Sequence, residues 1–317
     1  MIQYIKNLFL LILITGVFAA CQAIPEPEIV EDETTLMSRG NSKRAQNREF
    51  GAFLTATEEV NPAPVTSLGV GAASFHVSPD RSKIEYTIKV SQIENVLFAH
   101  IHVGEFGVNG PVVVTLIPPG SVPSGVVSGV IGSGTITAAN LQGSMAGQSL
   151  EDLISLMESG MTYVNVHTTQ FPPGEQRGQI SLVRPNENGN YTTQLSGSEE
   201  VPSNNSKARG VGIFKFNKDN TSLSYRVNVA QLVDVRFAHI HLGKKGFNGP
   251  VVVTLRGDRI DGRVNGVYAV GTITNNDLQG LLTGGDLDIL REALRTGNAY
   301  VNVHTDKFPP GEIRGQL

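Results

Sequence analysis

The sequence predicts an all-β protein made of two tandem Greek-key-like β-sandwich domains, each with one short α-helix. The composition, with 35 glycines, 16 prolines and only 17% charged residues, is typical of a turn-rich β protein. Long stretches of the chain occur twice, which predicts two copies of one unit. Within each copy apolar and polar residues alternate, as they do in strands that bury one face.

The first 20 residues resemble a bacterial lipoprotein signal peptide. A short start with Lys6 precedes an apolar run over residues 8–18, and two alanines stand directly before Cys21. The run is too short for an ordinary transmembrane helix. We therefore expect a signal peptide over residues 1–20 and a lipid on Cys21, the single cysteine of the chain. The alternative is an ordinary cleaved signal in which Cys21 has no special role.

Residues 21–48 are expected to form a flexible, lipid-anchored tether, because acidic residues and then basic residues replace the large apolar ones. The formal net charge of the chain is -4, which offers no broad basic field for nucleic acid. The expected partner is thus the membrane, through the lipid, together with an unidentified protein or envelope component. No nucleic-acid partner is expected.

Two folded units follow the tether, at residues 49–183 and 190–317, with a polar linker between them. The first repeated stretch is identical at 15 of 19 positions and carries His-x-His just before an Asn-Gly-Pro turn. The second is identical at 14 of 17 positions and carries Tyr-Val-Asn-Val-His and Gly-Glu-x-Arg-Gly. The matched segments are Phe98–Leu116 with Phe237–Leu255, and Tyr163–Gln179 with Tyr300–Gln316.

Local patterns predict the elements of each unit. Apolar residues at every second position from Ile84 to Val90 indicate a half-buried strand. Pro111 precedes a run of valines and suits the start of an edge strand. Ser149 and Asp152 resemble a helix capping box, the apolar residues after Ser149 recur at helical spacing, and a glycine follows as a stop signal. The second unit repeats this helix pattern from Asp286.

The repeated motifs, in the same order in both units, resemble the CHRD domain, a module named after the animal protein chordin and found in bacterial secreted proteins. The resemblance covers nearly all of residues 51–317 and implies two tandem CHRD domains, but it implies little about activity. A weaker similarity is to the copper/zinc superoxide dismutases, which are Greek-key β-sandwiches with His-x-His on one strand, a later strand histidine and an arginine near the C-terminus. The further histidines and the disulfide cysteines of the dismutases have no counterpart here.

Six of the seven histidines form three pairs of repeat equivalents. Residues i and i+2 of a strand share a face, so each His-x-His presents two imidazoles together, and the later histidine can complete a three-nitrogen site for copper or zinc. The expected metal ligands are His100, His102, His167, His239, His241 and His304. The residues expected to support the ligands or attract an anion are Glu175, Arg177, Glu312 and Arg314.

Two other interpretations of the histidines remain open at this level. The imidazoles can anchor turns by hydrogen bonds to backbone carbonyls while Glu-x-Arg forms an ion pair, or they can build a catalytic site without metal. The leading expectation is a non-enzymatic binding or structural protein of the bacterial envelope, anchored by lipid on the periplasmic or cell-surface side. The alternative is a copper-dependent redox enzyme or copper carrier of dismutase-like architecture.

Overall fold

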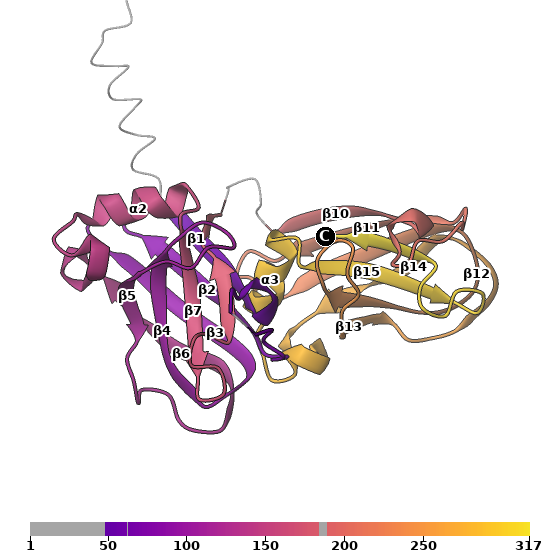
Figure 1. Cartoon of the computed structure of the whole chain (residues 1–317). Coiled ribbons are helices and arrows are strands. Elements are labelled where there is room, and N and C mark those ends of the chain that lie inside the picture. Colours follow the sequence, from indigo (N-terminus) through magenta and orange to yellow (C-terminus); the bar gives the residue numbers. More distant parts are fainter. Residues whose placement is uncertain (1–47, 62, 184–188) are drawn as a thin grey trace, which may run out of the picture. The chain divides into compact units, whose positions relative to one another are not determined.

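The computed structural model describes residues 48–61, 63–183 and 189–317 (Figure 1). The predicted signal peptide, Cys21, nearly all of the predicted tether and most of the linker therefore lie outside the described residues. Within these ranges no helix is long and apolar enough to cross a membrane.

The first domain is one continuous antiparallel sheet rather than two separate sheets. Its strands follow the order β5-β4-β7-β8-β1-β2-β3-β6, and β9 pairs with β1. The edge strand β5 starts one residue after Pro111, as predicted. The strands are β1 (Arg48–Thr55), β2 (Val70–Val77), β3 (Ile84–Glu94), β4 (Val96–Val103), β5 (Val112–Ile117), β6 (Val126–Ile136), β7 (Thr162–Thr168), β8 (Gln176–Gln179) and β9 (Ser181–Leu182).

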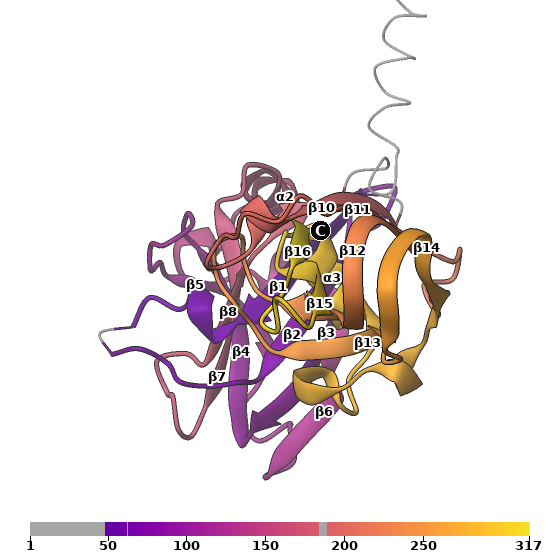
Figure 2. The ribbon, with the colours of Figure 1, turned by 90° about the vertical axis from the view of Figure 1, so that its right-hand side faces the viewer.

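The second domain repeats this arrangement with one long strand in place of β3 and β4. Strand β12 pairs with β11 and β14 through its first part and with β13 and β15 through its last part, so the sheet curls into a barrel-like form (Figure 2). The strands are β10 (Asn190–Ser196), β11 (Arg209–Phe216), β12 (Leu223–Leu242), β13 (Val251–Arg256), β14 (Ile260–Ile273), β15 (Ala299–Thr305) and β16 (Ile313–Gln316). The predicted all-β fold of two tandem domains is confirmed.

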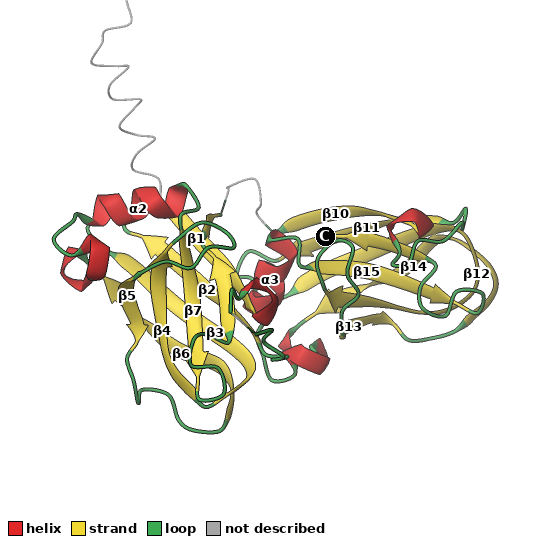
Figure 3. Ribbon diagram, viewed as in Figure 1, coloured by secondary structure: helices red, strands yellow, loops and turns green. Residues whose placement is uncertain are grey.

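Within the described residues each domain has one α-helix, as expected; the other short helical segments drawn red in Figure 3 are 3-10 turns. Helix α2 (Leu150–Glu158) begins at the predicted capping box, in which the Ser149 and Asp152 side chains each bond the backbone N–H of the other residue. Helix α3 (Leu287–Arg295) is capped by Asp286, whose carboxylate accepts a hydrogen bond from the backbone N–H of Asp288 in the first turn. The apolar face of each helix is buried, which explains the helical spacing of the leucines in the sequence.

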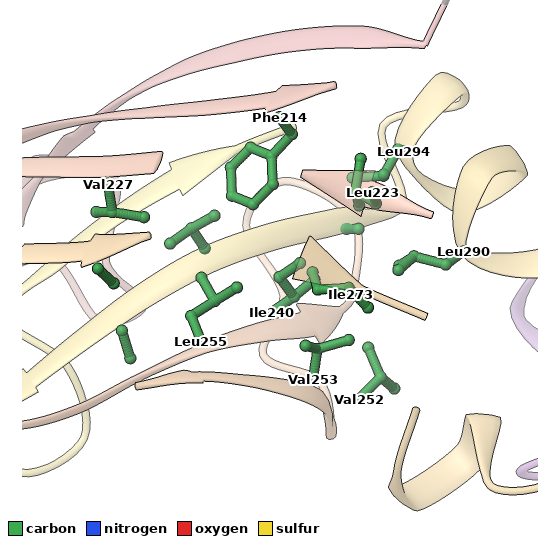
Figure 4. Close-up of a cluster of buried hydrophobic side chains, with 14 of the residues drawn as sticks. Phe214, Leu223, Val227, Ile240, Val252, Val253, Leu255, Ile273, Leu290 and Leu294 are labelled. Atoms are coloured by element: carbon green, nitrogen blue, oxygen red, sulfur yellow. The ribbon is translucent and has the colours of Figure 1, made fainter. Parts of the chain in front are cut away.

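Two hydrophobic clusters, one centred on each domain, fix the strands that carry the histidines. In the first domain the alternating residues of β3 point inward, with Ile84, Ile88 and Val90 fully buried. In the second, Phe214 and Ile240 belong to one buried cluster with Leu290 and Leu294 of α3 (Figure 4). Burial of such side chains stabilises each domain by roughly 1.5–3 kcal/mol apiece. The apolar face of each sheet therefore packs into the core, and the polar residues of the same strands lie on the opposite face.

Candidate metal centres

The histidines of the first domain come together on the outer face of β4 and β7. Alternation places His100 and His102 on one side of β4, and the antiparallel register sets Phe98 of that strand opposite His167 of β7. The intervening valines of β7 enter the core, so the side chains of Tyr163, Asn165 and His167 share the face of the β4 histidines. The second domain builds the same face from β12 and β15.

The three imidazoles of each domain are close enough to bind one ion. One ring nitrogen from each of His100, His102 and His167 can be chosen so that all three lie within 4.8 Å of one another. The ring centroids are 5.4, 5.8 and 6.1 Å apart. The matching separations in the second domain, among His239, His241 and His304, are 5.4, 5.7 and 6.0 Å. Folding therefore brings the later histidine to the His-x-His pair in both copies.

Backbone carbonyls fix the tautomers of two histidines in each domain. His102 Nδ1 lies 2.9 Å from the carbonyl oxygen of Gly110, and His167 Nδ1 lies 2.8 Å from that of Pro172. A carbonyl oxygen only accepts, so each Nδ1 carries the proton and each Nε2 keeps a free lone pair. In the second domain His241 and His304 bond the carbonyls of Gly249 and Pro309 at 2.9 Å each.

The lone pairs left by this arrangement are buried and unused. Among the described residues, Nε2 of His102 and of His167 has no hydrogen-bond partner, and neither has Nδ1 of His100. The same three atoms of His239, His241 and His304 are unpartnered. His100 is partly exposed, so the group reaches the protein surface at this histidine, although its unpartnered nitrogens are buried. Each domain offers one Nδ1 and two Nε2 donors, which fit a metal ion with an open coordination position.

The site favours neutral imidazoles. Burial, and then the neighbouring imidazoles, lower the pKa of His100 and of His239 from 6.5 to about 4. Burial also lowers the pKa of His241 to about 4 and lowers the pKa of His102, His167 and His304. Metal ligands must be deprotonated, so the folded protein holds these histidines in the form that binds metal.

We expect the metal-free protein to lose stability as the pH falls from about 6.5 to about 4. A histidine with a depressed pKa stabilises the folded state above its unfolded pKa, and that contribution is lost as protons bind. Glu59 and Glu200 act oppositely, because burial raises their pKa from 4.5 to about 7 and their contribution is lost as the pH rises. Six histidines lose their contribution on acidification and only two glutamates gain one, so the free energy of unfolding should fall as the pH is lowered.

Urea denaturation at pH 4.5, 5.5 and 7 measures this. The His100→Gln variant serves as the comparison, since it removes one of the depressed groups and should flatten the acid limb of the profile. A urea midpoint that rises on acidification would contradict the expectation.

A stack of three side chains, a histidine, a tyrosine and an arginine, lies beside each three-histidine group. The Tyr163 ring lies parallel to the His102 ring, with centroids 4.8 Å apart and planes inclined by 14°. The guanidinium of Arg177 lies over the same tyrosine, with Cζ 3.5 Å from the ring centroid. Strand β7 runs between β4 and β8, so histidine and arginine take opposite faces of the tyrosine. His241, Tyr300 and Arg314 repeat the stack, at 4.8 and 3.5 Å.

The arginine and the tyrosine also hold the loop that supplies a histidine acceptor. Arg177 donates to the carbonyls of Glu105 and Val108 at 3.1 and 2.9 Å and to Asn109 Oδ1 at 3.1 Å. The backbone N–H of Gly110 donates to the Tyr163 hydroxyl at 3.0 Å. The loop over residues 104–110, here called the Gly110 loop, is thus held by Arg177 and Tyr163, which lie beside the three-histidine group. In the second domain Arg314 and Tyr300 hold residues 243–249 in the same way.

Comparison with known families agrees with this duplicated geometry. The family model of the CHRD domain matches residues 50–180 and again residues 191–317. The chain belongs to the CHRD domain family. No curated protein matches the sequence. The two matches coincide with the two sheets, so each CHRD domain contains one complete three-histidine group.

The predicted supporting residues occupy different places around the three-histidine group of each CHRD domain. Glu175 accepts hydrogen bonds from Thr168 Oγ1 and Ser67 Oγ, both at 2.5 Å, and Glu312 accepts from Thr305 and Ser206 at 2.6 Å each. Both carboxylates lie outside the groups of converging nitrogens. The arginines Arg177 and Arg314 bond the loops rather than these glutamates.

Several contributors to the site went unassigned in the sequence. Tyr163, Asn165 and Gly110 stand within the repeated motifs, but the residue types alone give them no role. Glu59 lies outside those motifs, yet its carboxyl is close to Asn165 and carries a buried Oε1 without a partner among the described residues. Their exact recurrence at Glu200, Asn302, Gly249 and Tyr300 is the signal that could have identified them.

Proposed function

We propose that the protein is a lipid-anchored, extracytoplasmic binding protein that holds one metal ion in each CHRD domain. The ligands are His100, His102 and His167 in the first domain, with His239, His241 and His304 in the second. Two tandem CHRD domains support a binding or structural role. The observation that supports a metal is a set of six buried imidazole nitrogens with no partner among the described residues. The carbonyl hydrogen bonds leave a lone pair on four of them.

A purely structural role explains these nitrogens poorly. A histidine that only anchors a turn gains one hydrogen bond through Nδ1, yet here Nε2 of the same ring is buried without one. Leaving a buried polar atom unpaired costs about 1–3 kcal/mol. Three such atoms converge in each domain, and the arrangement recurs with centroid separations that agree within 0.1 Å. Convergence of unpaired donors is what a metal ion would satisfy.

Copper and zinc are the metals that this donor set suits. Imidazole binds both, whereas calcium and magnesium require oxygen ligands. In His102, His167, His241 and His304 the hydrogen bond from Nδ1–H to a carbonyl is the usual outer support of a metal-bound histidine, because it fixes the ring and raises the basicity of the other nitrogen.

The second candidate is a copper-dependent redox enzyme or copper carrier. It is favoured by the partial exposure of His100, because three protein ligands would leave a coordination position for water, substrate or a transfer partner. The group contains no fourth histidine, so any such activity would rest on three nitrogens alone.

The envelope location rests on the sequence before the first domain, where an apolar run over residues 8–18 leads to Cys21. Metabolic labelling with a radioactive fatty acid tests it. Label in the wild type that disappears in the Cys21→Ala variant supports the anchor, and an unlabelled wild type rejects it.

Metal binding is tested by titrating the mature chain with Cu(I), Cu(II) and Zn(II), followed by elemental analysis after gel filtration. We expect two equivalents per chain for at least one of these ions, because the two groups have the same geometry. Cycling of bound copper between its oxidation states, with turnover of superoxide as a further assay, would favour the enzyme. Bound copper without turnover would favour the carrier. If no ion binds more tightly than micromolar, metal binding fails for both domains.

A further inference from the structure

Each CHRD domain buries an arginine whose hydrogen-bond partners are all uncharged. Arg177 and Arg314 are both 1% exposed, and the donors of each go to two backbone carbonyls and an asparagine oxygen, with Gln316 in addition for Arg314. A buried guanidinium is expensive unless it is well paired. Uncharged side chains could donate the same hydrogen bonds to the loop. The permanent charge of a buried arginine at this position therefore needs a further explanation.

The arginine lies close to the three-histidine group, with only the tyrosine ring between the guanidinium and one of the histidines. The Arg177 guanidinium covers one face of Tyr163, and His102 stacks on the other. The stacking distances of 3.5 and 4.8 Å, together with a metal–nitrogen bond of about 2 Å, place the guanidinium within about 12 Å of the bound ion. The three ligands are neutral, so they supply no negative charge to offset it.

The neighbouring carboxyl only partly offsets the arginine. Glu59 is the carboxyl that most favours the charged form of Arg177, and Glu58 does so more weakly. Burial raises the pKa of Glu59 to about 7, so near neutral pH a large share of this group is uncharged. Glu200 stands in the same relation to Arg314. Arg177 and Arg314 therefore contribute a positive charge near each three-histidine group that this carboxyl does not fully offset near neutral pH.

We propose that Arg177 and Arg314 are positioning residues that make each three-histidine group favour monovalent Cu(I) over divalent Cu(II) and Zn(II). The inference rests on the proposed metal binding. A fixed positive charge repels a divalent ion twice as strongly as a monovalent one. For a separation of about 12 Å and an effective dielectric constant near 20, the difference corresponds to a preference of about tenfold.

The experiment uses the full chain with His239, His241 and His304 replaced by alanine, so that only the first group is measured. Dissociation constants for Cu(I), Cu(II) and Zn(II) are obtained by competition with chelators of known affinity, with Cu(I) kept reduced by ascorbate without oxygen. The Cu(I)/Cu(II) ratio of affinities also gives the reduction potential of the bound ion. The variants are Arg177→Gln, which removes the charge and keeps amide donors, and Arg177→Lys, which keeps the charge.

We expect Arg177→Gln to lose about tenfold of the preference for Cu(I) over Cu(II), and Arg177→Lys to keep most of it. A purely structural arginine would weaken all three metals by the same factor in both variants, and that outcome overturns the inference. If the parent chain binds none of the ions, the proposed metal binding fails instead. Circular dichroism confirms that each variant is folded before it is titrated.

Glu59→Gln provides a second route if removal of the arginine prevents folding. At pH 8 the Glu59 carboxyl is largely ionised, so its replacement removes negative charge and leaves Arg177 in place. The preference for Cu(I) should then rise severalfold. An unchanged ratio in this variant also overturns the inference.

Discussion

Replacing Gly110 by alanine should destabilise the first domain by about 3 kcal/mol or more. A Cβ at this position would coincide with the carbonyl oxygen of Val103 and lie 2.7 Å from its carbonyl carbon. Neither backbone segment can yield, because the N–H of Val103 bonds the carbonyl of Pro111 and the N–H of Gly110 bonds Tyr163. Overpacking against rigid backbone lies at the upper end of the effects of point mutations. Urea denaturation of the full chain measures the loss.

Gly107→Ala is the matched control in the same loop. Its Cβ would meet nothing within 4 Å, and only the positive φ of 76° opposes the change. The expected loss is about 1 kcal/mol, the strain of a left-handed backbone for a residue with a side chain. Equal losses in the two variants would show that the close approach at Gly110 is not what restricts the loop.

Replacing His167 by alanine should weaken metal binding in the first domain by about a hundredfold or more. Structural metal sites in small proteins bind with apparent free energies on the order of 10 kcal/mol, so one of three ligands accounts for roughly 3 kcal/mol. The second domain keeps its own group and serves as an internal reference in the same titration. Two-site binding in the wild type should become one tight and one weak step.

His76→Ala is the control for the histidine variant. His76 lies on β2, with Nδ1 3.8 Å from a carboxylate oxygen of Glu49, and belongs to neither metal group. Its replacement should leave both tight steps unchanged. If His76→Ala weakens binding as much as His167→Ala, the histidines act through overall stability rather than as ligands.

The strands, the helices and the shared histidine face follow from local periodicity. Alternation around Ile84 and Ile88 identifies a half-buried strand because the core selects every second residue. The capping box at Ser149 is equally local. The side on which His167 lies follows once its neighbouring valines are assigned to the core. These predictions can be made without knowing which strands, distant in the sequence, pack against each other.

The supports of the histidines depend on tertiary geometry that the sequence does not express locally. The acceptors for His102 and His167 are backbone carbonyls, and every residue has one, so the sequence cannot distinguish Gly110 or Pro172 as acceptors. The spacing of Glu175 and Arg177 predicted an ion pair as one alternative. In the structure Thr168 and Ser67 engage the glutamate, and the Gly110 loop engages the arginine. The long β12 likewise follows the path of both β3 and β4, which only Asn95 separates in the first domain. Bulges in β3 and β12 allow this path to turn the corner of the sheet in both domains, and such bulges have no local sequence signature.

The carbonyl hydrogen bonds of the histidines have a consequence for how a metal would arrive and leave. Zinc fingers assemble their ligands only when the metal binds, so metal removal unfolds them. Here the carbonyls of Gly110 and Pro172 already orient the rings of His102 and His167. The free energy needed to order these ligands is therefore supplied when the domain folds and not when the metal binds. A metal ion would then be loaded and released on the intact domain, past the partly exposed His100, at a rate set by access to the histidines rather than by refolding.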